Sequence, residues 1–169
     1  MAGYGRNHLE GSPYTWYGAV TKFDSAGHHI WSKEIRSDVK PGQALVAESI
    51  FELSDGSFIV TGTHTNPLST EPGNINEDFF AAKITSTGGL IWYKTFHSLM
   101  ENGCTSSNIR YVSVAEGLNG DLFLGGTIPN CPFPTHLVVF KLNSMGNIFG
   151  SIALEEMFIV SGFFLMEVI

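Results

Sequence analysis

Basic residues are scarce in this sequence. Lys and Arg total nine against sixteen Asp and Glu, which gives a net charge of −7 over 169 residues. Proteins that bind nucleic acid use clustered positive charge to displace counterions from the phosphate backbone. We therefore do not expect nucleic acid to be a partner.

Long apolar runs and a secretion leader are also lacking. The most apolar run, residues 157–166, is shorter than the roughly 20 residues of a membrane-spanning helix. No basic segment followed by an apolar stretch occurs near the first residues, so no signal peptide is recognisable. We expect no membrane span.

The common chemical motifs are missing too. Neither a Gly-x-Ser-x-Gly turn, nor a phosphate-binding loop, nor a His-Glu-x-x-His zinc motif occurs. The two cysteines, Cys104 and Cys131, do not form a Cys-x-x-Cys pair. We therefore expect no catalytic residue set, no metal site and no cofactor.

Glycine and short apolar segments are abundant. The chain has 19 Gly and 13 Phe, and 43% of its residues are hydrophobic. Segments such as residues 58–62 and 136–140 are aromatic or β-branched and too short for helices, and no segment shows a 3.6-residue apolar spacing. This pattern predicts an all-β protein.

Two patterns repeat along the chain at a spacing of about 60 residues. The first occupies residues 17–31, 78–92 and 136–150, and its copies share Lys22, Lys83 and Lys141, then Ser25, Ser86 and Ser144, then Gly27, Gly88 and Gly146. The second links residues 49–63 with 113–127, where Asp55-Gly56 matches Asn119-Gly120 and Gly62-Thr63 matches Gly126-Thr127.

Both patterns predict hairpins, because Asp-Gly, Asn-Gly and the Gly of Asp24–Gly27 suit tight turns between strands. Each repeat should then hold four strands, A to D. We predict strand A at 44–53 and 109–118, strand B at 57–63 and 121–127, strand C at 17–23, 78–84 and 136–142, and strand D at 28–36, 89–96 and 147–153.

The combined pattern resembles the β-propeller repeats of large secreted and cell-surface bacterial proteins. A hairpin with Gly four residues before Trp, as at Trp31 and Trp92, is also similar to the tryptophan motif of quinoprotein propellers. The resemblance covers residues 17–150. It implies a β-propeller fragment of four-stranded antiparallel blades, indole rings packed between blades, and an extracellular or cell-surface location. It leaves the function open, since propellers host many activities.

One partial propeller over residues 1–169 is expected, with a half-blade at 1–36, blades at 44–96 and 109–153, and an irregular end at 154–169. Gly150 stands where the other copies have tryptophan. A closed propeller typically needs four to eight blades. Either the chain is a fragment of a longer propeller, which we favour because open edge strands invite aggregation, or several copies close a ring.

The connections after strands B and D are long, whereas the A–B and C–D turns are short. Long loops on a rigid scaffold usually carry binding. We predict a binding face on the long-loop side. Its candidate residues, which could equally be ordinary solvated loop residues, are Tyr14, Trp16, His64, Asn66, Glu71, Asn74, Asp78, His97, Glu101, Asn108 and Arg110.

Cys104 and Cys131 fall in two long loops of the same repeat. A disulfide between them would fit an oxidising compartment, and two free thiols are the alternative.

The sequence thus favours a non-enzymatic module that binds a protein or a glycan. The alternative is a piece of a propeller enzyme, such as a quinoprotein-like dehydrogenase or a polysaccharide lyase or hydrolase. Such an enzyme would place acidic residues or histidines at the inner strand ends, where this chain offers Arg110 and Tyr111.

Overall fold

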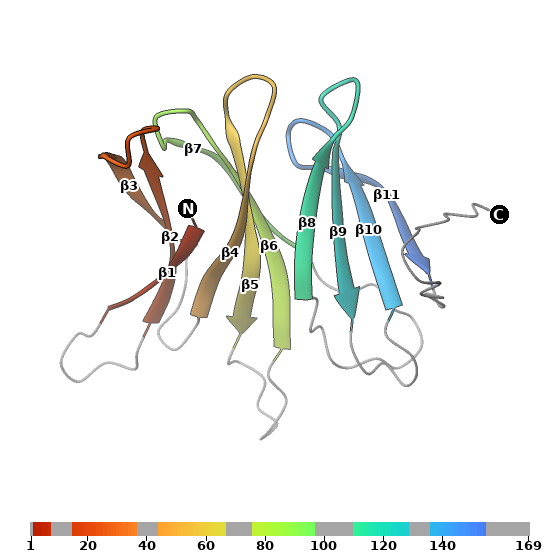
Figure 1. The fold of residues 1–169 in the computed structure, drawn as a ribbon. Helices are drawn as coiled ribbons and strands as arrows, with labels where there is room; N and C mark the ends of the chain where they lie inside the picture. The colour runs from red at the N-terminus through yellow and green to blue at the C-terminus, as the bar shows by residue number, and fades with distance from the viewer. Residues whose placement is uncertain are drawn as a thin grey trace, which may run out of the picture.

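Every regular element in the described part of the chain is a β-strand (Figure 1). The computed structural model describes residues 2–7, 15–36, 44–66, 76–96, 110–128 and 136–154. In chain order the strands are β1 (Ala2–Asn7), β2 (Thr15–Phe23), β3 (His29–Ile35), β4 (Ala44–Glu52), β5 (Phe58–Asn66), β6 (Asn76–Ile84), β7 (Leu90–Phe96), β8 (Arg110–Glu116), β9 (Leu122–Ile128), β10 (His136–Leu142) and β11 (Ile148–Leu154). The all-β prediction is confirmed, and the predicted strand bounds agree with these to within a few residues.

The strands pair into three antiparallel units. We call β1–β3 the N-terminal unit, β4–β7 the middle unit and β8–β11 the C-terminal unit, and within each unit neighbours in sequence are neighbours in the sheet. A single parallel bridge between Trp16 and Ala44 joins the first two units into one sheet. The N-terminal unit has three strands in place of the four of the other two.

The hairpin turns that alternate with the long connections share one backbone geometry. In the first of them, Asp24 N donates to His28 O at 2.9 Å and Gly27 N donates to Asp24 O at 3.1 Å. The same pair of bonds closes the turns that begin at Leu53, Thr85, Gly117 and Asn143. The fourth turn residue is always a glycine at positive φ, between 73° and 85°, as a type I turn followed by a G1 bulge requires.

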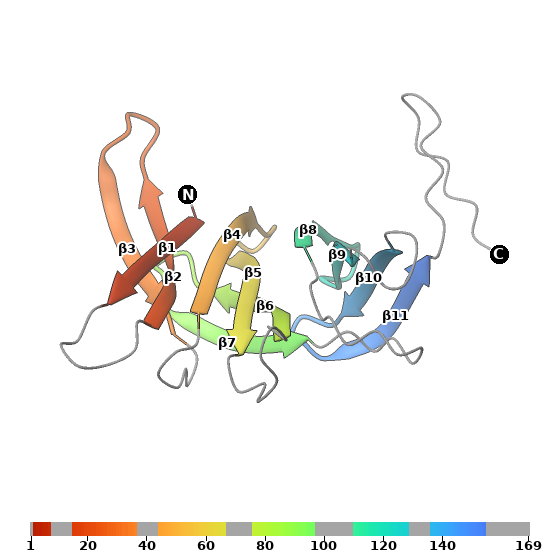
Figure 2. The same ribbon diagram turned by 90° about the horizontal axis from the view of Figure 1, so that it is seen from below.

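The middle unit is buried on both faces. Alternate strand residues point to opposite sides, so Phe80 of β6 packs with Val20 of the N-terminal unit, while its neighbour Phe79 packs on Phe140 of the C-terminal unit with ring centroids 5.3 Å apart. The other cluster members are Ile35, Leu45, Ala47, Phe58, Val60, Ala82 and Ile84 on the first side and Leu53, Ile59, Ala81, Phe96, Leu122, Leu124, Val138 and Leu142 on the second. Figure 2 shows the three units side by side in an arc.

A tryptophan from each of the first two units contacts the turn of the unit that follows. Trp31 Nε1 donates to the carbonyl of Ser86 at 3.2 Å, and Trp92 Nε1 donates to that of Ser144 at 3.1 Å. The rings lie so close to the turn glycines that a Cβ atom added at Gly88 would be 3.2 Å from Trp31. The expected packing of both indoles between repeats is confirmed, with each ring half-buried.

This contact predicts unequal effects of alanine at two turn glycines. Gly56→Ala places a side chain in open space, so backbone strain at φ +76° alone should cost about 1–2 kcal/mol of unfolding free energy. Gly88→Ala, at φ +83°, adds a Cβ 2.6 Å from Lys33 Cγ as well as the Trp31 contact, and should cost about 1 kcal/mol more. Urea unfolding of both variants measures the difference, and equal losses would contradict a tight indole–turn contact.

Candidate functional site

The strand directions separate short and long connections onto two edges. Strands β4, β6, β8 and β10 begin, and β5 and β9 end, at the lower edge in Figure 1. The five tight turns lie at the opposite edge, which we call the short-turn edge. The long connections therefore join the strands at the lower edge, which we call the long-connection edge. The predicted binding residues lie in these connections or at the strand ends beside them.

Two of the predicted binding residues are direct neighbours at the long-connection edge. His64 of β5 pairs across the sheet with Asp78 of β6. His64 also pairs with Leu45 on its other side, and its side chain is half-buried. Asn66 lies two residues further along β5, opposite Asn76. The middle unit thus brings an imidazole-bearing and a carboxylate-bearing residue to one place on this edge.

Two further candidates begin strands in the neighbouring units. Trp16, near the start of β2, pairs with Arg6 and bridges to Ala44 at the start of β4. Arg110 begins β8 and pairs with Thr127. All three units therefore contribute a predicted residue to the long-connection edge.

The remaining candidates lie outside the described residues. These are Tyr14, Glu71, Asn74, His97, Glu101 and Asn108, together with Cys104 and Cys131 of the predicted disulfide. Their roles stay predictions.

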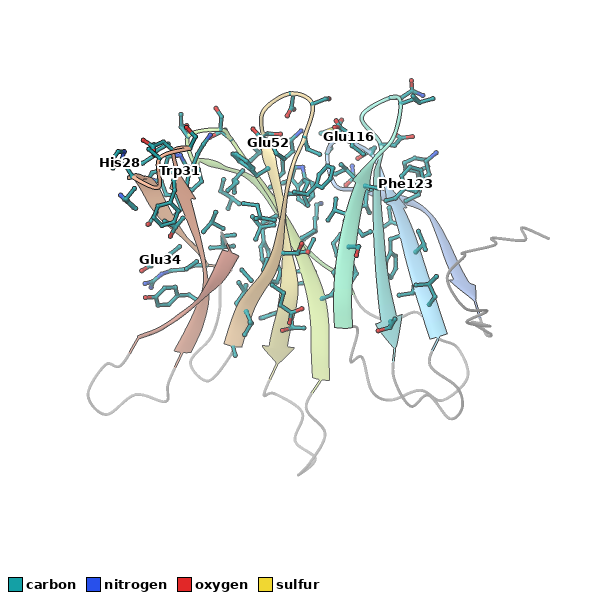
Figure 3. All side chains as sticks on the ribbon, in the orientation of Figure 1. His28, Trp31, Glu34, Glu52, Glu116 and Phe123 are labelled. Carbon is teal, nitrogen blue, oxygen red and sulfur yellow. The ribbon has the colours of Figure 1, made fainter. Side chains whose placement is uncertain are left out.

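A cleft at the short-turn edge was not predicted from the sequence. It lies between the N-terminal and middle units, has a volume of about 390 Å³, and is lined by Val20, Thr21, Lys22, Phe23, Trp31, Ile50, Glu52 and Phe58. Trp31 meets Phe58 edge to face, with centroids 6.4 Å apart, and Lys22 Nζ lies 5.1 Å from the Phe58 centroid. Figure 3 labels Trp31 and Glu52 near this edge. We call this the short-turn cleft.

The three recurring lysines differ in their partners, and this difference leaves the Lys22 ammonium in the short-turn cleft. Lys83 Nζ donates to Asp55 Oδ2 at 2.9 Å, and Lys141 Nζ lies 3.2 Å from Asp121 Oδ2. For Lys22, the corresponding lysine of the N-terminal unit, no carboxylate lies within ion-pair distance in the described part of the chain. Its ammonium rests on the Phe58 ring, a cation–π contact.

Asp55 is the most strongly perturbed acid in the described residues. It accepts hydrogen bonds from the Ser57 hydroxyl, from Lys83 and from the Ser57 backbone N–H, and these lower its pKa to about 2. Lys83 is 11% exposed, so its charge is largely withdrawn from water and depends on this carboxylate. The Asp55–Lys83 pair has a structural role.

The short-turn cleft is suited to binding. An ammonium, a carboxylate and three aromatic rings around a cleft of this size can hold a small polar ligand that has an apolar face. No group of three or more His, Cys, Asp or Glu in the described residues is close enough together to bind a metal ion. The same residues include no helix long and apolar enough to cross a bilayer.

No protein-family model and no curated protein matches the chain. The arrangement of the strands and their side chains is therefore the basis for the function that we propose.

The Asp55–Lys83 pair predicts a pH-dependent stability difference. Asp55→Asn should cost about 1–2 kcal/mol at pH 7, because it leaves the Lys83 ammonium without its partner. Since the pKa of Asp55 is lower in the folded chain than the ordinary 3.8, its contribution is complete above pH 4 and is lost as pH falls toward 2. The gap between variant and wild type should close over that range in urea unfolding.

Asp121→Asn is the matched control. Its partner Lys141 is 39% exposed, so losing this pair should cost less than about 1 kcal/mol. Equal losses in the two variants would show that the burial of Lys83 does not matter.

Proposed function

We propose that the chain is part of a β-propeller and that this propeller is a non-enzymatic module that binds a protein or a glycan. Two four-stranded antiparallel units and a three-stranded one, side by side in an arc, support the propeller, because blades pack in this way around a central axis. Burial of both faces of the middle unit supports it too, since an inner blade has a neighbour on each side.

The observation that supports the binding role is that short turns and long connections lie at opposite edges of the sheets. Five near-identical turns occupy the short-turn edge, while every long connection between the described strands leaves from the other. Loops that differ in length and sequence on a rigid sheet are the usual site of recognition. We therefore propose the long-connection edge as the ligand-binding face.

The residues of this face suit a hydroxyl-rich or peptide ligand. His64 and Asp78 are cross-strand neighbours on β5 and β6, Asn66 follows on β5, and Trp16 lies near the start of β2. Carboxylate, amide and indole groups are side-chain types that hydrogen-bond or pack against sugars and peptides. Such a ligand agrees with an extracellular or cell-surface location, which the family resemblance implies and which forms part of the same proposal.

A binding screen tests this function. The purified chain should bind at least one glycan on an array, or one purified cell-surface protein, in a saturable way. Replacing His64 and Asp78 together by alanine should weaken that binding by about tenfold or more, equivalent to about 1.4 kcal/mol. Glu52→Gln, at the opposite edge in the short-turn cleft, is the control and should leave the affinity unchanged.

Three outcomes would contradict the proposal. Absence of any saturable ligand would reject the binding module, and loss of binding only in Glu52→Gln would move the site to the short-turn cleft. Turnover of a redox dye with added quinone cofactor and calcium, or cleavage of a polysaccharide, would show that the chain belongs to a propeller enzyme.

A further inference from the structure

One turn lacks the contact that the two equivalent turns make. The Ser86 and Ser144 carbonyls each accept an indole N–H from the preceding unit. Ser25 occupies the same place in the first turn, Asp24–Gly27, and no indole reaches its carbonyl from any described residue. A Cβ added at Gly27 would meet nothing within 4 Å, whereas one at Gly146 would lie 3.0 Å from Trp92.

The residue just before each turn shows the same difference. Ile84 and Leu142 are 2% and 0% exposed, and each belongs to the cluster that includes the preceding unit. Phe23, which also lies at the rim of the short-turn cleft, holds the equivalent position in the N-terminal unit and is 42% exposed. Its ring contacts the exposed His29 edge to face, with centroids 6.1 Å apart. An aromatic ring and a bare turn thus lie next to each other.

We infer that Phe23 and the Asp24–Gly27 turn form a docking site for a preceding β-sheet unit that supplies a tryptophan from its outermost strand. The indole would donate its N–H to the Ser25 carbonyl and lie over Gly27, beside Phe23. This repeats the geometry that the chain uses twice internally. The inference rests on the packing of the units and not on the ligand proposed above.

A second copy of this chain does not fit as the partner. Trp31 and Trp92 are the cross-strand partners of Lys22 and Lys83, but the partner of Lys141 at the same register is Gly150. The C-terminal unit therefore has no indole at this register to offer a following turn. The occupant is a β-unit, in the same polypeptide or another, that carries tryptophan there.

The rest of the docking face is more polar than its internal equivalents. Thr21 and Ser32 are hydrogen-bonded to each other at 3.0 Å where the middle unit has Ala82 and Tyr93. Less apolar area would be buried there, so the indole contact should account for a larger share of the docking affinity than it does inside the chain.

A tryptophan introduced at position 150 allows one copy of the chain to test the docking site of another. Gly150→Trp gives the C-terminal unit an indole, and the Cβ that it adds would meet Lys141 Cβ at an ordinary 3.8 Å. We expect the variant to associate head to tail, with a solution mass in light scattering that rises with concentration well above that of the wild type. Gly150→Phe, which has no N–H donor, should associate several-fold more weakly.

Two double variants identify the surface that the introduced indole would occupy. Adding Gly27→Val to Gly150→Trp should return the mass to the wild-type value, because a branched side chain covers the turn. Adding Gly56→Val should leave the association intact, since this turn has the same backbone strain but lies clear of neighbours even in the doubly packed middle unit. An unchanged mass for Gly150→Trp, or association that survives Gly27→Val, would overturn the inference.

A measurement without Gly150→Trp checks that the turn is bare. Gly27→Val in the wild-type background should shift the urea midpoint no more than Gly56→Val does, whereas Gly88→Val should shift it further. A shift for Gly27→Val as large as that for Gly88→Val would mean that the turn is already covered, and would reject the docking site. None of these results depends on whether a glycan or protein binds the long-connection edge.

Discussion

Burial of the middle sheet on both faces constrains residues 58–62 of β5 and 79–84 of β6, which are all buried. A strand with one solvated face alternates apolar and polar residues, but here both Phe79 and Phe80 need an apolar neighbour, one in each adjacent unit. A charged side chain can be buried in this sheet only together with a partner of opposite charge, and Lys83 is buried beside Asp55. The low charge content of the chain follows from this packing, and so does the dependence of each unit on its neighbours.

Regularity at one edge leaves the other edge free to vary. The indole–turn contacts fix the separation of neighbouring units at the short-turn edge, and they demand a glycine and a backbone carbonyl, not a particular side chain. At the long-connection edge no tryptophan–turn contact recurs among the described residues: the first two units are joined there by the single Trp16–Ala44 bridge, and Trp16, His64 and Arg110 lie on three different units. Loop length and sequence there can change without disturbing the stack.

The strands could be predicted from the turns between them, because each turn requires a glycine at positive φ and that glycine is visible in the sequence. The packing of Trp31 and Trp92 was also predictable, since both stand at the same place in the repeat. The short-turn cleft was not, because the Lys22–Phe58 contact joins different units and depends on which lysine lacks an acidic partner. Of the predicted site, His64 and Asp78 could be paired only once the β5–β6 register was known.

The two ends of the stack are not complementary to each other. At the C-terminal unit Lys141 rests on Phe149 and Phe123, 4.5 and 5.6 Å from their centroids, so a lysine shields rings that are 54% and 36% exposed. A ring of identical chains would set this face, with Gly150 in place of tryptophan, against the Ser25 turn. That junction would lack the hydrogen bond and ring contact found at both internal junctions, and would be the weakest in the ring. A junction of equal strength requires a unit that brings an indole, which favours a longer assembly over closure by copies of this chain alone.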